Sequence, residues 1–260
     1  MADDELTAKI GAINAQLPKL GTEQLSFIQS IVDRLSQPFT FNRNDASDLV
    51  SPGVLRDFGD ILRVHHVMSA EALSKDRFEY AIEKVLNDNK VEAKRSSRGN
   101  PGHDITIRGV PFSLKTEASK NIREATVHIS KFMEMGKGQW TDQLTDLNGL
   151  RDRFFNHMKS YDRILTLRRL PRTGAHYYEL VEIPKSLLLE AEHGHMEMMF
   201  GSTQMPKPGY CTVTDQYGRI KFQLYFDGGT ERKLQIKALD KGLCTVHATW
   251  SFPIATVPEL

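Results

Sequence analysis

The hydrophobic period changes abruptly at about one third of the chain, and this change most constrains the fold. Up to residue 88, apolar residues recur at helical spacing, as Leu73, Phe78, Ile82 and Val85 do. From residue 90 onward, apolar and polar residues alternate, which is the period of a half-buried strand. The sequence therefore predicts a helical N-terminal part followed by a strand-rich part, which is an α/β fold.

The first half of the chain divides into elements by spacing and by capping residues. We expect helices within residues 1–66, including one that starts at Ser51-Pro52, and then a helix over 70–88 that Ser69 caps. Three short strands should follow at 90–96, 103–108 and 111–117. A further helix should begin at Ser119, with one face formed by Ile122, Ala125, Ile129, Phe132 and Met133.

The second half reads as a helix over 143–158, strands at 162–169 and 175–183, and a short helix at 185–192. An irregular stretch at 193–209 precedes a strand-rich tail at 210–252. We expect a mixed central β-sheet flanked by helices, divided into a helical subdomain at 1–66, a core at 67–160 and a strand-rich region at 161–260. One continuous domain is equally compatible with these boundaries.

Composition excludes several classes of protein. Apolar residues make up 40% of the chain and charged residues 26%, which fits a folded chain. No apolar run approaches the roughly 18–20 residues of a membrane-spanning helix, and the N-terminal MADDELTAKI lacks the apolar core of a secretory signal. We therefore expect a cytoplasmic protein with no membrane partner. Two cysteines, Cys211 and Cys244, are too few for a disulfide scaffold or a cysteine zinc cage.

The net charge of +1 hides an uneven distribution. Residues 1–62 hold 5 basic and 9 acidic residues, whereas residues 90–123 hold 8 basic and 3 acidic residues. A basic middle around a few acids suits a protein that binds a polyanion such as DNA. An ordinary solvated surface would show the same charges.

The candidate catalytic residues lie on the two predicted strands that flank Gly109. Asp104 lies on one strand, and Ser113, Lys115 and Glu117 share one face of the next. If the strands pair, Asp104 comes close to Lys115. A carboxylate beside an ammonium at a sheet edge can hold Mg²⁺ and orient a water. Lys115 could instead be an outward-facing strand lysine.

The preceding helix adds two carboxylates. Glu79 and Glu83 are four residues apart, so they share one helix face beside the apolar stripe. From there they could lean toward Asp104. They could equally be solvated charges.

The order helix, three strands, helix, with Asp104 and the pair Leu114-Lys115 on the strands, resembles the PD-(D/E)XK nuclease superfamily. The resemblance covers residues 70–135. Two positions depart from the pattern, because Pro101 lies three residues before Asp104 and Ser113 stands at the acidic position before X-K. Some members of the superfamily use Ser there, with a carboxylate from elsewhere, and here Glu79, Glu83 or Glu117 could supply it.

The chain looks most similar to small type II restriction endonucleases such as MspI and its relatives. This resemblance implies that Asp104, with Glu79 and Glu83, ligates Mg²⁺. Lys115 would orient or deprotonate the attacking water or stabilise the phosphate, and Ser113 would hydrogen-bond a metal-bound water.

Binding to duplex DNA requires cations for phosphates and hydrogen-bonding side chains for base edges. Ser119, Lys120 and Asn121 should open a helix whose amide groups also face a phosphate. Lys233, Gln235 and Lys237 alternate on one strand face that could enter a major groove, although a solvated strand would look the same. The full set of expected DNA contacts is Lys94, Arg95, Arg98, Ser119, Lys120, Asn121, Arg123, Arg168, Arg169, Arg172, Gln204, Lys207, Arg219, Lys221, Arg232, Lys233, Gln235 and Lys237.

The leading hypothesis is a Mg²⁺-dependent type II restriction endonuclease that cuts double-stranded DNA at a short specific sequence. Two alternatives stay open: a repair or structure-specific nuclease of the same superfamily, and a catalytically inert nucleic-acid-binding protein. A homodimer would match a symmetric DNA site. A cognate DNA methyltransferase is expected genetically, but not as a bound partner.

Overall fold

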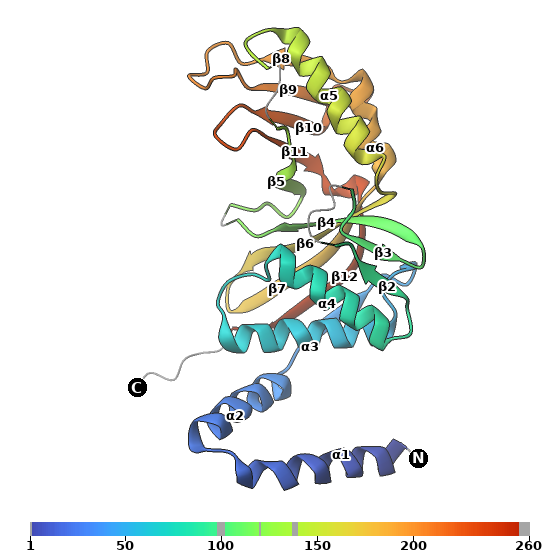
Figure 1. The fold of residues 1–260 in the computed structure, drawn as a ribbon, viewed down its shortest axis with the longest axis vertical. Coiled ribbons are helices and arrows are strands. Elements are labelled where there is room, and N and C mark those ends of the chain that lie inside the picture. Colours follow the sequence, from blue (N-terminus) through green and yellow to red (C-terminus); the bar gives the residue numbers. More distant parts are fainter. Residues whose placement is uncertain (1, 98–101, 120, 137–139, 255–260) are drawn as a thin grey trace.

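A computed structural model describes residues 2–97, 102–119, 121–136 and 140–254 of this chain. Its helical elements and strands build an elongated molecule with two sheets (Figure 1). The helical elements are α1 (Ala2–Gln16), η1 (Leu17–Lys19), α2 (Thr22–Ser36), α3 (Pro52–Met68), α4 (Lys75–Asp88), α5 (Leu144–Met158), α6 (Lys185–Leu189), η2 (Glu190–His193) and η3 (Lys241–Leu243). The strands are β1 (Thr40–Arg43), β2 (Ala93–Arg95), β3 (Ile105–Ile107), β4 (Val110–Glu117), β5 (Thr126–Glu134), β6 (Arg163–Arg172), β7 (Ala175–Ile183), β8 (His195–Met198), β9 (Gly209–Thr214), β10 (Ile220–Asp227), β11 (Lys233–Asp240) and β12 (Thr245–Pro253).

The first sheet has seven strands in the order β1-β12-β7-β6-β4-β3-β2. It is mixed, because β4 and β6 pair in parallel while the other neighbours are antiparallel. Helices α3 and α4 cover one face of it (Figure 1). Phe58 and Phe78 from these helices pack with Leu114 and Trp250 from the sheet in one buried core. The predicted mixed sheet flanked by helices is confirmed.

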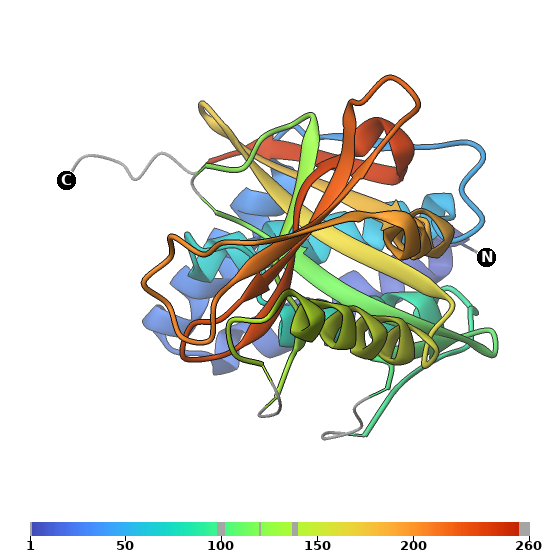
Figure 2. The ribbon, with the colours of Figure 1, turned by 90° about the horizontal axis from the view of Figure 1, so that it is seen from above.

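The second sheet has five strands in the order β5-β11-β10-β9-β8. Its strands run across those of the first sheet, as the view from above shows (Figure 2). A second core joins the two sheets with α5 and α6, and it includes Ile164 and Val181 of the first sheet, Leu224 of the second and Phe154 of α5. The chain passes from one sheet to the other after β4, where β5 begins.

The hairpin that was expected to carry the chemistry is present. Strands β3 and β4 pair across Gly109, with Ile105 opposite Phe112. Gly109 has a φ of +79°, a conformation that costs glycine little, so it suits this tight turn. The predicted strand boundaries around this turn are confirmed to within a few residues.

The helix expected to begin at Ser119 is wrong, because residues 126–134 form strand β5. The pairing of β5 with β11 is irregular: Met133 lies opposite Leu234, but Ile129 lies opposite Ile236, so β5 contains extra residues. This bulge places both Ile129 and Phe132 in the core, three residues apart, and so imitates helical spacing. The amide groups of a helix N-terminus are therefore not available for a phosphate at Ser119 and Asn121, and Lys120 lies outside the described residues.

Smaller differences concern boundaries and short strands. Helix α4 starts at Lys75 with Ser74 as its cap, whose side chain accepts a hydrogen bond from the Arg77 amide, so Ser69 does not cap it. Strand β1 interrupts the region expected to be helical, and β8 lies within the stretch expected to be irregular. Both are four-residue strands, too short for a clear period-2 pattern.

The seven-stranded sheet draws strands from all three expected segments, namely β1, then β2 to β4, and then β6, β7 and β12. The division at residues 66 and 160 stays a prediction. Within the described residues, no helix is both long and apolar enough to cross a membrane.

Candidate active site

Asp104 is fixed over the start of β4 by three hydrogen bonds. Its backbone amide donates to the Phe112 carbonyl at 2.9 Å. Its Oδ2 accepts from the Leu114 amide at 2.6 Å and from Ser113 Oγ at 3.1 Å. The strand pairing thus brings the carboxylate of Asp104 directly onto the Ser113-Leu114-Lys115 segment, as the period-2 argument predicted.

Helix α4 contributes a lysine and a glutamate to the same place. Lys75 Nζ donates to Asp104 Oδ1 at 2.7 Å and to Glu79 Oε1 at 2.7 Å. The predicted approach of Glu79 to Asp104 is therefore present, with the Lys75 ammonium between the two carboxylates. Burial tends to lower the pKa of Lys75, but the bonds to Asp104 and Glu79 outweigh it, and the pKa is raised.

Lys115 is buried on the inner face of β4, with an exposed fraction of 8%. Burial lowers its pKa to about 8, and the nearby charge of Asp104 opposes that shift. Asp104 responds in the other direction. Burial tends to raise its pKa, but the charges of Lys115 and Lys75 together with hydrogen bonds hold it below its usual value. Asp104 is therefore ionised at neutral pH, whereas the pKa of Lys115 lies close to neutral pH.

Aromatic rings form the wall opposite this pair. Lys115 Nζ lies 5.2 Å from the centroid of the Phe132 ring. The His157 ring packs edge-on against Phe132 at 6.2 Å and against Tyr161 at 5.4 Å. Burial, followed by the charge of Lys115, lowers the pKa of His157. The low polarity of this wall explains why the ammonium of Lys115 loses its proton more easily than usual.

Glu83 does not join this group. Its Oε1 accepts from the Arg95 amide at 2.8 Å and its Oε2 from Arg95 Nε at 2.6 Å. Arg95 is also stacked on the Tyr80 ring at 3.3 Å. Glu83 thus ties α4 to β2 and lies one turn beyond Glu79. The expectation that both glutamates approach Asp104 holds for Glu79 alone.

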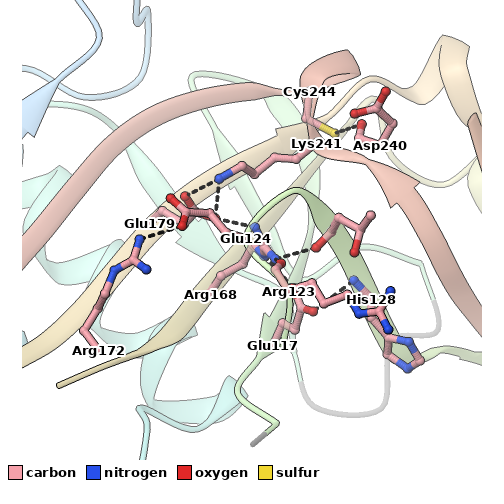
Figure 3. A network of polar contacts seen from close by, with 11 residues as sticks. Glu117, Arg123, Glu124, His128, Arg168, Arg172, Glu179, Asp240, Lys241 and Cys244 are labelled. Carbon is pink, nitrogen blue, oxygen red and sulfur yellow. Dashed lines mark hydrogen bonds and ion pairs between the residues drawn. The ribbon is translucent and has the colours of Figure 1, made fainter. Parts of the chain in front are cut away.

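Glu117 lies on the same face of β4 as Lys115, but a second polar network holds it (Figure 3). Arg168 Nε donates to Glu117 Oε2 at 2.5 Å, and Arg168 also pairs with Glu179, which in turn pairs with Lys241 at 3.0 Å. Burial raises the pKa of Glu117 despite the charge of Arg168. Because Glu117 and Arg168 neutralise each other in the interior, neither is free to hold a metal ion or to meet a DNA phosphate.

The chemistry of the donor set fits a hard divalent cation. Two carboxylate oxygens, from Asp104 and Glu79, already converge on a single ammonium. Mg²⁺ prefers such oxygens and keeps several waters, so two carboxylates suffice when a substrate phosphate completes the shell. The described residues contain no cluster of three or more His, Cys, Asp or Glu side chains suited to a metal.

Several of the expected DNA contacts in the middle of the chain are exposed. Lys94, Ser119, Asn121 and Arg123 are exposed, and Arg98 lies outside the described residues together with Lys120. Arg169 donates to the Ala70 carbonyl at 2.6 Å. The contact of these exposed side chains with DNA stays a prediction.

The strand-rich region presents the predicted alternation on β11. Leu234 and Ile236 are buried, whereas Lys233, Gln235 and Lys237 are half-buried on the opposite face. Most of the other candidates have acidic or carbonyl partners, and the exposed ion pairs among them are weak enough to be exchanged for phosphates. These partnered candidates are Arg172 with Glu124, Gln204 with Asp227, Lys207 with the Ser202 carbonyl, Arg219 with Asp215, Lys221 with Glu190, Lys233 with Glu231 and Gln235 with Asp227; Arg232 is half-buried.

The sequence reasoning missed four residues that border the site: Lys75, His157, Tyr161 and Thr166. The spacing of Lys75 and Glu79 is that of a helical ion pair, which could have indicated Lys75. His157 comes from α5, Tyr161 from the segment leading into β6 and Thr166 from β6 itself. Their proximity to the site depends on the parallel pairing of β4 with β6, which no local sequence pattern predicts.

Comparison with known proteins identifies the class. A family model described as SmaI, a type II site-specific deoxyribonuclease, matches residues 13–252. This match includes the hairpin, α4 and both sheets, so the chain belongs to the SmaI family of type II site-specific deoxyribonucleases. No solved structure matches the chain.

A particular relative supports the same assignment. The type II restriction enzyme SmaI of Serratia marcescens is 48% identical to this chain over 209 residues, which are 80% of this chain and 83% of that enzyme. The chain is therefore a type II restriction endonuclease that acts on double-stranded DNA, and enzymes of this class use a divalent metal ion. Of the three functional hypotheses, the first is confirmed at this level.

Proposed function

We propose that this enzyme hydrolyses DNA phosphodiester bonds with Mg²⁺ held by Asp104 and Glu79, and with Lys115 beside the reacting phosphate. The observation that carries the proposal is that Asp104 Oδ1 and Glu79 Oε1 both accept hydrogen bonds from the Lys75 ammonium. This group lies next to the buried Lys115. The same arrangement supports membership of the PD-(D/E)XK superfamily, with Glu79 in place of the acid that Ser113 replaces. The likeness to MspI remains a prediction.

Each side chain has a role that follows from its surroundings. A bound metal ion would polarise the phosphate and acidify a water. Asp104 is held ionised, so it presents negative charge for that ion. Lys115, with a pKa of about 8, is mostly protonated at neutral pH and can stabilise charge on a phosphate oxygen. Its lowered pKa also allows it to exchange a proton with the attacking water.

Ser113 has a second role besides the one expected. Its hydroxyl donates to Asp104 Oδ2, so it orients the carboxylate. Its hydroxyl lone pairs can still accept from a metal-bound water. Ser113→Ala should therefore reduce cleavage less than Asp104→Asn does.

The test is a plasmid cleavage assay with and without Mg²⁺. We expect Asp104→Asn and Lys115→Ala to lower the cleavage rate by roughly 10²–10⁴-fold, because the first removes the charge that holds the metal ion and the second removes the cation beside the phosphate. Both variants should still bind DNA in a gel-shift assay. Lys84→Ala is the matched control, since Lys84 lies on α4 and pairs with Asp88 at the surface. Normal cutting by either site variant would refute the assignment.

We also propose that the enzyme works as a homodimer through its first 39 residues. Of the 19 exposed large apolar side chains among the described residues, 8 lie in this segment. Only Lys19 and Glu23 are charged between residues 10 and 32, and a depletion of charge of this kind marks interface cores. The apolar side chains are Leu6, Ile10, Ile13, Leu25, Phe27, Val32, Leu35 and Phe39.

The remaining parts of the proposal follow from the class. A cytoplasmic location would place the enzyme where invading DNA arrives. A cognate DNA methyltransferase would protect the host sites without binding the enzyme. The exposed basic residues near the hairpin would bind phosphates, and β11 would read bases.

A further inference from the structure

Two hydroxyl groups are buried without a hydrogen-bond partner among the described residues: Thr166 Oγ1 and Tyr161 Oη. Both side chains have an exposed fraction of 0%. Leaving a buried hydroxyl unpaired is unfavourable, and most such groups in native proteins bond to ordered water when the chain offers no partner. Each of these hydroxyls therefore requires a partner that the described polypeptide does not supply.

The strand register places Thr166 beside Lys115. In the parallel pairing of β4 with β6, Lys115 lies opposite Thr166. Two residues further along the same strands, Glu117 lies opposite Arg168, and those side chains are in contact at 2.5 Å. Because alternate residues share a face, Thr166 and Lys115 project to the same inner side. On the other side of Thr166 lies the apolar Val181.

Tyr161 approaches this region from before the start of β6. It lies two residues before Arg163, the first residue of that strand, and its ring packs against His157. The His157 ring contacts Phe132, whose ring lies under Lys115 Nζ. Burial, followed by the charge of Asp104, raises the pKa of Tyr161, so its hydroxyl keeps its proton and acts as a donor.

We propose that ordered water occupies an internal site walled by Lys115, Thr166 and Tyr161, and that Thr166 and Tyr161 position the Lys115 ammonium through it. Water suits this place because it accepts two hydrogen bonds and donates two. A water can accept from the Lys115 ammonium or from the Tyr161 hydroxyl, and it can donate to Thr166 Oγ1. The positioning role rests on the proposed function of Lys115, whereas the water site itself does not.

The proposal separates the effect of these hydroxyls on activity from their effect on stability. Thr166→Val and Tyr161→Phe preserve shape and remove only the hydroxyl. If the hydroxyls hold water at Lys115, we expect kcat to fall at least about 10-fold with KM changed less than about 2-fold. The melting temperature should change little, because each hydroxyl bonds to water and to no side chain or backbone group of the described residues. A purely structural role would lower the melting temperature and leave kcat per folded molecule unchanged.

Two further variants are matched controls. Thr166→Ser restores the hydroxyl, so it should recover most of the cleavage rate lost in Thr166→Val. Tyr178 is equally buried but lies in the other core, where its hydroxyl bonds to His66 Nε2 at 2.8 Å and to the Leu73 amide at 3.3 Å. Tyr178→Phe should lower the melting temperature and leave kcat unchanged.

A crystal structure at about 1.5 Å resolution or better tests the site independently of activity. Water density within hydrogen-bond distance of Thr166 Oγ1 supports the proposal, and its absence overturns it. Unchanged kcat in both Thr166→Val and Tyr161→Phe overturns the positioning role. Normal cleavage by Lys115→Ala would refute the proposed function of Lys115 and this role with it, but the density would still decide whether the water site exists.

Discussion

At the scale of single residues, the site depends on how much each charge is buried. Lys115 is held in the interior beside an aromatic ring, whereas Lys75 is partly exposed and bridges two carboxylates. The same side-chain type therefore has a lowered pKa in one place and a raised pKa in the other. Burial disfavours the charged form of a lysine and a neighbouring carboxylate favours it, and at Lys75 the carboxylates prevail.

Lys75 should compete with the metal ion. Because its ammonium lies where a cation would meet Asp104 and Glu79, we expect Lys75→Met to lower the Mg²⁺ concentration for half-maximal cleavage by about 3-fold or more. Titration of the initial cleavage rate against Mg²⁺ measures this. Lys84→Met, on the solvent side of the same helix, should leave the titration unchanged. An increased Mg²⁺ requirement in Lys75→Met would show that the lysine helps to bind the substrate instead.

At the scale of elements, the Arg168 network joins the two sheets. Arg168 lies on β6 of the first sheet, and its Nη2 donates to the carbonyls of Arg123 and Thr126 where β5 of the second sheet begins. It also binds Glu117 at the end of β4. The network therefore fixes the point at which the chain leaves the catalytic strand for the second sheet (Figure 3).

Removing Arg168 should destabilise the protein strongly. Arg168→Met leaves Glu117 and Glu179 buried without their shared partner, and breaking such a group costs about 3–5 kcal/mol. Chemical denaturation monitored by circular dichroism measures the free energy of unfolding. Arg172→Met is a suitable control, because Arg172 pairs with Glu124 at the surface and should cost less than about 1 kcal/mol. Similar stability in the two variants would contradict this account.

At the scale of the whole molecule, two buried histidines join α3 to the first sheet. His66 stacks on His176 with ring centroids 3.6 Å apart, and its Nε2 lies 2.8 Å from the hydroxyl of Tyr178. Burial lowers the pKa of His66 to about 3 and that of His176 to about 4. Both rings are therefore neutral in the folded protein at neutral pH.

Acid should unfold the protein partly through this pair. Between about pH 6.5 and pH 4 the unfolded chain binds protons that the folded protein does not, so stability should fall as the pH falls through that window. We expect the loss to be on the order of 2 kcal/mol or more. Urea denaturation at pH 7 and pH 4.5 gives the difference. His66→Phe should reduce this pH dependence, and an unchanged slope would refute the assignment.

The proposed dimer should depend on the apolar face of the first helix. Ile10→Gln combined with Ile13→Gln should convert a dimer into a monomer in sedimentation velocity experiments, because it removes apolar side chains from the interface. Plasmid cleavage by the monomer should accumulate the singly nicked form. Tyr217→Gln, at an exposed turn, serves as the control. A wild-type protein that is monomeric at micromolar concentration would refute the proposal.

The sequence by itself determined the α/β class, the hairpin at Gly109 and the meeting of Asp104 with Lys115, because these depend on local periodicity and on pairing across a tight turn. Tertiary packing alone decided that Glu79 and not Glu83 joins the site, and that Glu117 and Arg168 serve the interior. It also made residues 126–134 a bulged strand, placed Thr166 beside Lys115 and packed Tyr161 against His157. Contacts of this kind join residues that are distant in the sequence, and burial and charge in the folded protein select among partners that the sequence leaves equivalent.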